Sequence, residues 1–270
     1  MNITFIGGGN MARAIIGGLV AKGFAPAAIG VVEVLAQARE RLQRELGVRC
    51  YGSPAQAAPY GELVVMAVKP QQMHAAAMQV APALAGQLVL SIAAGTRITD
   101  LSRWLGGHRV IVRCMPNTPA LIGAGVTAAC AAPEVSAAQR EQAALVLEAV
   151  GTVLWVEDEA LLDPVTAVSG SGPAYVFYFI EAMQQAALEL GLSGEQARVL
   201  SLETFLGAAK LAMGGTDPVS VLRERVTSKG GTTEAALASM GADRVKEAIV
   251  RAIRAASARG RELGDELGRD

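Results

Sequence analysis

The sequence predicts an α/β amino-terminal domain, with a mostly parallel, doubly wound sheet, followed by an all-α carboxy-terminal domain. Short apolar runs alternate with helical patterns over residues 1–157, and the strand pattern then stops. Long segments rich in Ala, Leu and Glu follow to the end of the chain. Alternation of the first kind is typical of βαβ units. We therefore expect one domain over residues 1–160 and a helical domain over residues 161–270.

The apolar runs of the first half have the length of buried strands, and glycines or prolines follow most of them. In an open α/β sheet the ligand binds beyond the carboxyl ends of the strands, so the turns after these runs should share one edge. The expected strands cover residues 3–6, 29–34, 63–68, 88–92, 110–114 and 152–156.

The second half has helix-forming composition, with turn signals between its segments. Its apolar faces are wide and rich in small residues, which allows helices to pack closely. We therefore expect a homodimer interface in this half. The expected helices cover residues 174–190, 194–212 and 243–263.

Charge and cysteine content exclude several classes of function. The chain has 24 basic and 25 acidic residues among 270, so we expect neither a nucleic-acid partner nor an anionic membrane surface. Its three cysteines are widely spaced, which argues against a disulfide framework and against a zinc site. The chain opens directly on a strand-like run without a leader pattern. We therefore expect a cytoplasmic protein.

A glycine-rich turn directly follows the first expected strand. Residues 7–12, Gly-Gly-Gly-Asn-Met-Ala, fit the pattern G-x-G-x-x-A ahead of a helical segment. Gly7 permits the tight turn, Gly9 lets the backbone approach a pyrophosphate, and Ala12 allows close contact between helix and strand. This context predicts a dinucleotide-binding Rossmann domain, although a plain glycine-rich turn has the same pattern.

An acidic residue, Glu33, stands near the end of the second expected strand. A carboxylate there hydrogen-bonds an adenosine ribose and repels the 2′-phosphate of NADP(H). Glu33 therefore favours NADH, while Arg39 and Arg41 are either phosphate ligands or part of a solvated helix start. The cofactor is accordingly expected to be NADPH or NADH.

Three further turns are candidates for the site. Lys69 and Pro70 end the third expected strand, and we interpret them as a turn that lines the cofactor. Residues 115–119, Met-Pro-Asn-Thr-Pro, either face the nicotinamide or form a rigid connection. Residues 169–175, Ser-Gly-Ser-Gly-Pro-Ala-Tyr, either cap a long helix or form a wall of the active cleft.

The histidines and serines do not form a catalytic or metal-binding pattern. His74 and His108 are the only histidines and stand in separate regions, so zinc chemistry and a histidine proton relay are not expected. Ser171 lies in a Gly-Ser-Gly sequence, but the run before it is short and no histidine follows it. It is therefore not the nucleophile elbow of a hydrolase.

Hydroxyl residues flank two adjacent glycines in the run 226–233, Val-Thr-Ser-Lys-Gly-Gly-Thr-Thr. Such residues are poor choices for a helix interior. Free backbone N–H groups at the start of a following helix suit a small anion such as a carboxylate. The run is either a substrate site or a helix end followed by an ordinary amino-terminal cap.

With all these motifs in this order, the chain resembles the pyrroline-5-carboxylate reductases over residues 1 to about 240. The resemblance implies that NAD(P)H reduces the C=N bond of 1-pyrroline-5-carboxylate to L-proline, the last step of proline biosynthesis. It also implies a Rossmann domain followed by a helical domain that interlocks with a second subunit, in dimers that often assemble into decamers. The run 227–233 is the most specific element of the match.

The resemblance also implies roles for individual residues. Thr233 would contact the ring nitrogen, as hydrogen-bond partner and catalytic residue, and its change to Ala is expected to lower turnover more than tenfold. The substrate carboxylate would bind Ser228, Gly231, Thr232 and Thr233. The cofactor would bind Gly7, Gly9, Asn10, Met11, Glu33, Ala67, Val68, Lys69, Pro70 and Ala93.

Two alternatives to this assignment stay open. A related β-hydroxyacid or imine reductase would use a lysine of the helical half, where Lys210, Lys229 and Lys246 are the only ones. A non-catalytic NAD(P)-sensing protein would bind the cofactor without turnover, and would leave the run 227–233 unexplained. The chain also departs from the family at Glu33, where many members carry residues that receive the 2′-phosphate of NADPH.

Overall fold

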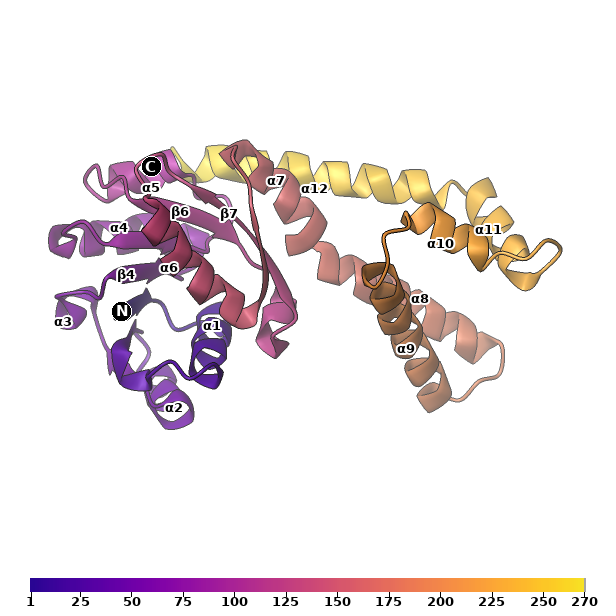
Figure 1. The fold of residues 1–270 in the computed structure, drawn as a ribbon, viewed down its shortest axis with the longest axis horizontal. Coiled ribbons are helices and arrows are strands. Elements are labelled where there is room, and N and C mark those ends of the chain that lie inside the picture. The colour runs from indigo at the N-terminus through magenta and orange to yellow at the C-terminus, as the bar shows by residue number, and fades with distance from the viewer. Residues whose placement is uncertain (270) are drawn as a thin grey trace. The chain divides into compact units, whose positions relative to one another are not determined.

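The structure is a computed structural model that describes residues 1–269 (Figure 1). The chain forms two compact units. The first comprises Met1–Ser171 together with the end of the chain from Ala255, and the second comprises Gly172–Arg254. The sequence placed a domain boundary near residue 160. The compact units divide at Ser171, and the end of the last helix, from Ala255, belongs to the first unit.

The first unit is built on one eight-stranded sheet of order β3-β2-β1-β4-β5-β6-β7-β8. All neighbouring strands are parallel except β6 and β7, so the expectation of a mostly parallel sheet is confirmed. The strands are β1 (Ile3–Ile6), β2 (Ile29–Val32), β3 (Arg49–Tyr51), β4 (Leu63–Met66), β5 (Leu88–Ser91), β6 (Ile111–Met115), β7 (Gly125–Ala131) and β8 (Gly151–Trp155).

Strands β1, β2, β4 and β5 are buried at every position, which explains why they read as continuous apolar runs. Their side chains alternate between two hydrophobic clusters on opposite faces of the sheet. In β4, Leu63 and Val65 belong to one cluster, whereas Val64 and Met66 belong to the other. The sheet is therefore covered on both faces, as a doubly wound fold requires.

The helices of the first unit divide between these faces. Residues of α1, α2 and α6 belong to the same cluster as Leu63, and residues of α3, α4 and α5 to the same cluster as Val64. The helices are α1 (Asn10–Ala21), α2 (Ala36–Leu46), α3 (Pro54–Ala57), α4 (Met73–Val80), α5 (Ile98–Trp104), α6 (Ala137–Leu147) and α7 (Leu162–Val165).

Two strands were not expected from the sequence. Strand β3 has only three residues, and β7 has the sequence Gly-Val-Thr-Ala-Ala-Cys-Ala, whose small residues show no strand-like alternation. Strand β7 pairs antiparallel with β6 and parallel with β8. It therefore links the last expected strand, β8, to the rest of the sheet.

The second unit is entirely helical, as predicted, and has almost no core of its own. Among its described residues only Ala197 and Ser201 are buried. Large apolar side chains are open to solvent, including Phe177 at 65% and Leu190 at 84% exposure. Its helices are α8 (Gly172–Glu189), α9 (Gly194–Met213), α10 (Val219–Arg225), α11 (Thr232–Ala242) and the first part of α12 (Val245–Leu267).

The end of α12 packs against the turn after β5 in the first unit. Arg97 forms an ion pair with Asp265, with 2.5 Å between Nη2 and Oδ1. A β-carbon at Gly264 would lie 3.3 Å from the carbonyl oxygen of Gly95, so the two backbones approach closely there. The small residue at position 264 permits this contact.

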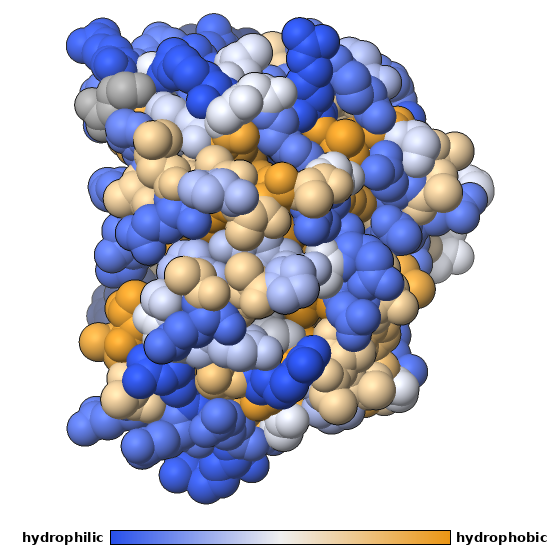
Figure 2. Space-filling model, turned by 90° about the vertical axis from the view of Figure 1, so that its left-hand side faces the viewer, coloured by the Kyte–Doolittle hydropathy of each residue, from blue (hydrophilic) through white to orange (hydrophobic). Residues whose placement is uncertain are grey.

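One face of the first unit carries polar and apolar side chains side by side. Figure 2 views this unit from the side on which α3 and α4 lie in Figure 1, and hydrophilic residues there are interspersed with smaller hydrophobic groups. No helix within residues 1–269 is both long and apolar enough to cross a membrane.

The packing of α1 against the segment before β8 yields a stability prediction. A β-carbon at Gly18 would lie 2.3 Å from the carbonyl oxygen of Ala149, whereas one at Gly17 would meet nothing closer than 3.9 Å. We expect Gly18→Ala to lower the free energy of unfolding by about 1–3 kcal/mol through overpacking. Gly17→Ala, the matched control, should raise it by up to about 1 kcal/mol through helix propensity.

Urea unfolding at one fixed protein concentration measures both variants, because association contributes to apparent stability. Equal effects of the two substitutions would contradict the packing argument.

Candidate functional site

The turns after β1 and β4 lie next to each other at the carboxyl edge of the sheet. The N–H of Gly7 donates to the carbonyl of Val32 at 2.8 Å, and that of Ala67 donates to the carbonyl of Ile6 at 2.8 Å. A cleft of about 590 Å³ opens there. It is lined by Ile6, Gly7, Gly8, Gly9, Val32, Glu33, Val34, Leu35, Pro54, Ala67, Val68, Lys69, Gln71, Gln72, Ala75, Ala76 and Gln79.

The two motif glycines serve different purposes. Gly7 has φ +104°, and a β-carbon there would lie 2.7 Å from the carbonyl oxygen of Ala67, so only glycine fits the turn. Gly9 precedes the first residue of α1 and has an extended conformation. A β-carbon at Gly9 would meet no atom within 4 Å. The space beside Gly9, at a helix amino terminus, is therefore open to an anion.

Glu33 stands at the end of β2 with its carboxylate held in place. Oε2 accepts the N–H of Gly8 at 3.1 Å, and Oε1 accepts that of Leu35 at 3.0 Å. Arg39 does not pair with this carboxylate, because its Nη1 donates to the backbone carbonyls of Glu33 and Val34 at 2.8 and 2.9 Å. The cleft therefore presents a negative charge at this position.

Arg41 was left open as a phosphate ligand or as part of a solvated helix. In the structure its Nε donates to Glu45 Oε1 at 2.8 Å, along the exposed side of α2. A second pocket of about 660 Å³ joins this helix start to the glycine turn, and Asn10 and Glu33 line it with Arg41.

Three of the residues assigned to the cofactor do not line either cavity. Met11 is part of α1 and packs against the hydrophobic core. Ala93 is buried and follows the end of β5, and Pro70 begins a short 3₁₀ turn. Their direct contact with a cofactor stays a prediction. Conversely, sequence reasoning missed the wall formed by Gln72, at the end of this 3₁₀ turn, and by Ala75, Ala76 and Gln79 of the following helix α4.

Asn117, one of the residues that the sequence left between two roles, acts as a connection. Its Oδ1 accepts the N–H of Val126 at 2.9 Å, and its Nδ2 donates to the carbonyl of Ser169 at 3.2 Å. The side chain is buried. Both the oxygen and the nitrogen of the amide therefore form hydrogen bonds within the protein.

The run 227–233 connects α10 to α11 in the second unit. Gly230 has φ +74°, its N–H donates to Glu234, and the N–H of Gly231 donates to the carbonyl of Ser228 at 3.0 Å. Gly231 precedes α11 without a side-chain cap. The first N–H groups of α11 have no acceptor within the helix, which leaves them for an anion.

The side chains assigned to the substrate surround this helix start. Thr233 is half-buried, whereas Ser228 and Thr232 are exposed. Thr232 and Thr233 are the first two residues of α11, and the bond from the N–H of Gly231 to the carbonyl of Ser228 keeps Ser228 next to this helix start. The carboxylate of Glu234, in the same turn, accepts the hydrogen bond from the N–H of Gly230.

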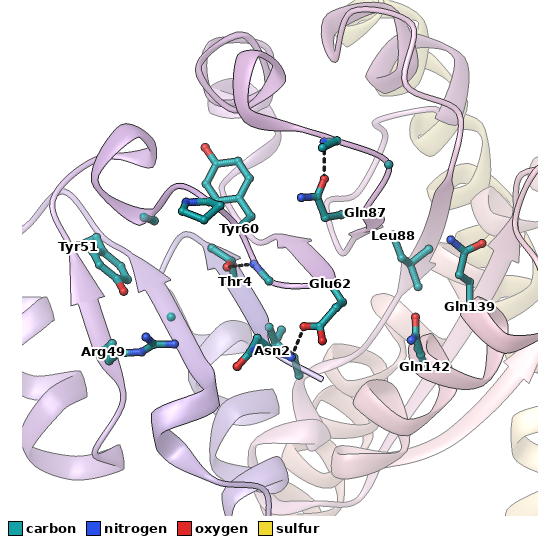
Figure 3. Close-up of a pocket in the computed structure, with 17 residues that line it drawn as sticks. Asn2, Thr4, Arg49, Tyr51, Tyr60, Glu62, Gln87, Leu88, Gln139 and Gln142 are labelled. Carbon is teal, nitrogen blue, oxygen red and sulfur yellow. Dashed lines mark hydrogen bonds between the residues drawn. The ribbon is translucent and has the colours of Figure 1, made fainter.

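A larger cavity, of about 720 Å³, lies at the opposite edge of the sheet, where the strands begin (Figure 3). Asn2, Thr4, Arg49 and Glu62 are among the residues around it, and none of the predicted site residues is. Thr4 Oγ1 accepts the N–H of Gly61 there at 3.0 Å. Because ligands of open α/β sheets bind at the carboxyl edge, this cavity is not the candidate active site.

Within residues 1–269 no cluster of three or more His, Cys, Asp and Glu side chains has the arrangement of a metal site. The ring of His74 lies beside that of Trp104, with 5.2 Å between the centroids. Complete burial raises the pKa of the Cys114 thiol, so this thiol stays protonated and unreactive at neutral pH.

Comparisons with known proteins agree along the whole chain. A family model described as pyrroline-5-carboxylate reductase dimerisation matches residues 159–263, and one described as NADP oxidoreductase, coenzyme F420-dependent, matches residues 2–95. The pyrroline-5-carboxylate reductase of Pseudomonas aeruginosa is 48% identical over 267 residues, which is 98% of both chains.

Solved structures show the same likeness. A pyrroline-5-carboxylate reductase from Coxiella burnetii is 41% identical and superposes with a TM-score of 0.91, over 97% of this chain and 98% of that one. The Plasmodium falciparum enzyme, solved with NADP bound, is 27% identical with a TM-score of 0.88 over 98% of each chain. The chain therefore belongs to the pyrroline-5-carboxylate reductase family.

Proposed function

We propose that this protein uses NAD(P)H to reduce the C=N bond of 1-pyrroline-5-carboxylate to L-proline, the last step of proline biosynthesis. Relatives of this name match the chain over nearly its full length, and one of their structures was solved with NADP bound. The observation that carries the proposal is the hydroxyl-rich, uncapped start of α11, in a chain that also has an open anion position beside Gly9.

The chemistry suits a site of this composition. A protonated cyclic imine is already electrophilic, so the protein needs chiefly to orient it and exclude competing reactions. The cofactor, when bound, supplies the hydride to the imine carbon.

The residues of this chain divide the remaining tasks. The N–H groups at the start of α11, with Ser228 and Thr232, bind the carboxylate. The hydroxyl of Thr233 hydrogen-bonds the ring nitrogen and relays to it a proton taken up from solvent, which gives the protonated imine that accepts the hydride. Gly7 and Gly9 let the backbone hold a pyrophosphate, with the N–H groups of α1 directed at it.

The same proposal includes association of the chain with itself. The second unit leaves most of its large apolar side chains open, and the matched family model is one for dimerisation. Contact with a second copy would cover this surface. Further assembly into a decamer rests on the family resemblance, and a cytoplasmic location rests on the unpaired cysteines.

The decisive test of the reaction follows NADH and NADPH oxidation with 1-pyrroline-5-carboxylate and with a small panel of hydroxy and imino acids. We expect turnover with the pyrroline, and a fall in kcat of more than tenfold in Thr233→Ala, because the hydroxyl that contacts the ring nitrogen is lost. Thr233→Ser keeps that hydroxyl and should retain most activity.

Three results would contradict this assignment. Preferential reduction of another panel member would favour a related reductase, and cofactor binding without any turnover would favour a sensing protein. Unchanged kinetics in Thr233→Ala would remove the role of Thr233.

Glu33 yields a prediction about cofactor choice. Its fixed carboxylate should accept a ribose hydroxyl of NADH and repel the 2′-phosphate of NADPH. We therefore expect a higher kcat/KM for NADH, and we expect Glu33→Ser to raise kcat/KM for NADPH at least tenfold. Glu40→Ser, which removes an exposed carboxylate nearby on α2, is the control and should leave the ratio unchanged. A large NADPH advantage in the wild-type protein would show this interpretation to be wrong.

Substitutions of the two motif glycines should affect different properties, cofactor binding for Gly9 and thermal stability for Gly7. A methyl group at Gly9 would enter only the space reserved for the pyrophosphate, so Gly9→Ala should weaken NADH binding at least tenfold at unchanged Tm. Gly7→Ala should lower the Tm, because its β-carbon meets the Ala67 carbonyl and its φ is positive. Nucleotide fluorescence titration and thermal unfolding measure the two effects. Wild-type affinity in Gly9→Ala would place the cofactor elsewhere.

A further inference from the structure

The residues Thr166–Gly170 form a π-helical turn between α7 and α8. The N–H of Ser171 donates to the carbonyl of Thr166, five residues earlier, at 2.8 Å. Turns of this kind are rare and are found frequently at functional sites. This one lies at the end of the first unit, because Gly172 is the first residue of the second.

The π-helical turn is attached to the end of β6 by the side chain of Asn117. The N–H of Val126 requires an acceptor and the carbonyl of Ser169 requires a donor, so a primary amide satisfies both groups. A carboxylate would satisfy only Val126, and an apolar side chain neither. With 9% exposure, Asn117 is shielded from the water that would replace its bonds.

A second contact keeps the same two segments together. A β-carbon at Gly170 would lie 2.6 Å from Cε of Met115, the last residue of β6. The backbone of the π-helical turn therefore lies directly on the end of this strand. Both contacts are within the first unit.

The position of this attachment in the sheet relates it to the reacting end of the cofactor. Strands β1, β4, β5 and β6 are consecutive and parallel, so their carboxyl ends share one edge. Glu33, at the end of β2, marks the adenosine side of that edge. A dinucleotide extends from there across β1 toward β4 and β5. The nicotinamide end thus lies on the side of the edge where β6 and Asn117 are.

We propose that Asn117 is a positioning residue for hydride transfer. By holding the carbonyl of Ser169, it fixes the π-helical turn as a wall at the reacting end of the site. This inference rests on the proposed reductase function. It requires that loss of the amide donor lowers kcat while the affinity for the cofactor, whose other end binds near Glu33, changes little.

The test compares two substitutions of Asn117. In Asn117→Ala we expect kcat with 1-pyrroline-5-carboxylate to fall at least tenfold, with the Kd for NADH within twofold of wild type. Asn117→Asp should show the same loss at pH 8, because its carboxylate has no proton to donate to Ser169. Its kcat relative to wild type should rise toward pH 6, since a buried carboxyl gains a proton there and becomes a donor.

Thr4→Val is the matched control. It removes one partly buried hydrogen bond between a side chain and a loop backbone at the opposite edge of the same sheet, the bond drawn in Figure 3. It should lower the Tm, by less than Asn117→Ala because one hydrogen bond is lost rather than two, but leave kcat unchanged. Equal falls of kcat in both variants, or a pH-independent Asn117→Asp, would overturn the positioning role.

Amide hydrogen exchange gives a measurement that does not depend on turnover. We expect faster exchange over residues 166–171 in Asn117→Ala and not in Thr4→Val. Unchanged protection of this segment would overturn the inference, whatever the protein catalyses. Absence of wild-type turnover, with exchange accelerated as expected, would count against the reductase function alone.

Discussion

Burial of apolar surface is divided very unevenly between the two units, and this imbalance determines what each unit needs in order to be stable. The first unit encloses two hydrophobic clusters around its sheet, whereas the second buries only Ala197 and Ser201 among its described residues. The free energy of folding comes mainly from such burial, so five helices with so little of it require additional contacts. For the second unit, folding and association are therefore expected to be one process. Its stability then depends on protein concentration.

In the first unit, the parallel arrangement of the strands brings the residues of the candidate site together. Because the strands from β3 to β6 all run in one direction, residues far apart in sequence reach one edge without any long loop. Gly9, Glu33 and Lys69 reach one cleft in this way. The cavity at the opposite edge is larger, yet none of the predicted site residues lines it. The direction of the strands, rather than the size of the cavities, therefore indicates the edge of the sheet at which a ligand is expected to bind.

The sequence predicts most of this fold because the central strands are continuous apolar runs bounded by glycine and proline. It does not predict β7, because the alanines and the glycine of this strand have low strand propensity and its pairing with β6 and β8 is not visible in the sequence. The same limit applies to the site. The motif at Gly7 and the charge of Glu33 are local features and are readable from the sequence, but the bond from Asn117 to Ser169 joins residues 52 positions apart.

Packing also decides details that local patterns leave open. Met11 fits the motif as well as Asn10 does, yet it packs against the core while Asn10 lines a pocket. The sequence around α12 predicts a helix, but its amphipathic pattern does not reveal that its end belongs to the first unit.

The path of the chain gives the second unit an unusual kind of attachment. It is an insertion, entered after the π-helical turn and left through the continuous helix α12. A single proteolytic cut in one of its connecting turns would give two fragments, and each would carry a part of the first unit: residues 1–171 in one and the end of α12 from Ala255 in the other. The end of α12 packs against the first unit without a covalent bond to it, so a nicked protein should stay assembled and show its cut only after denaturation.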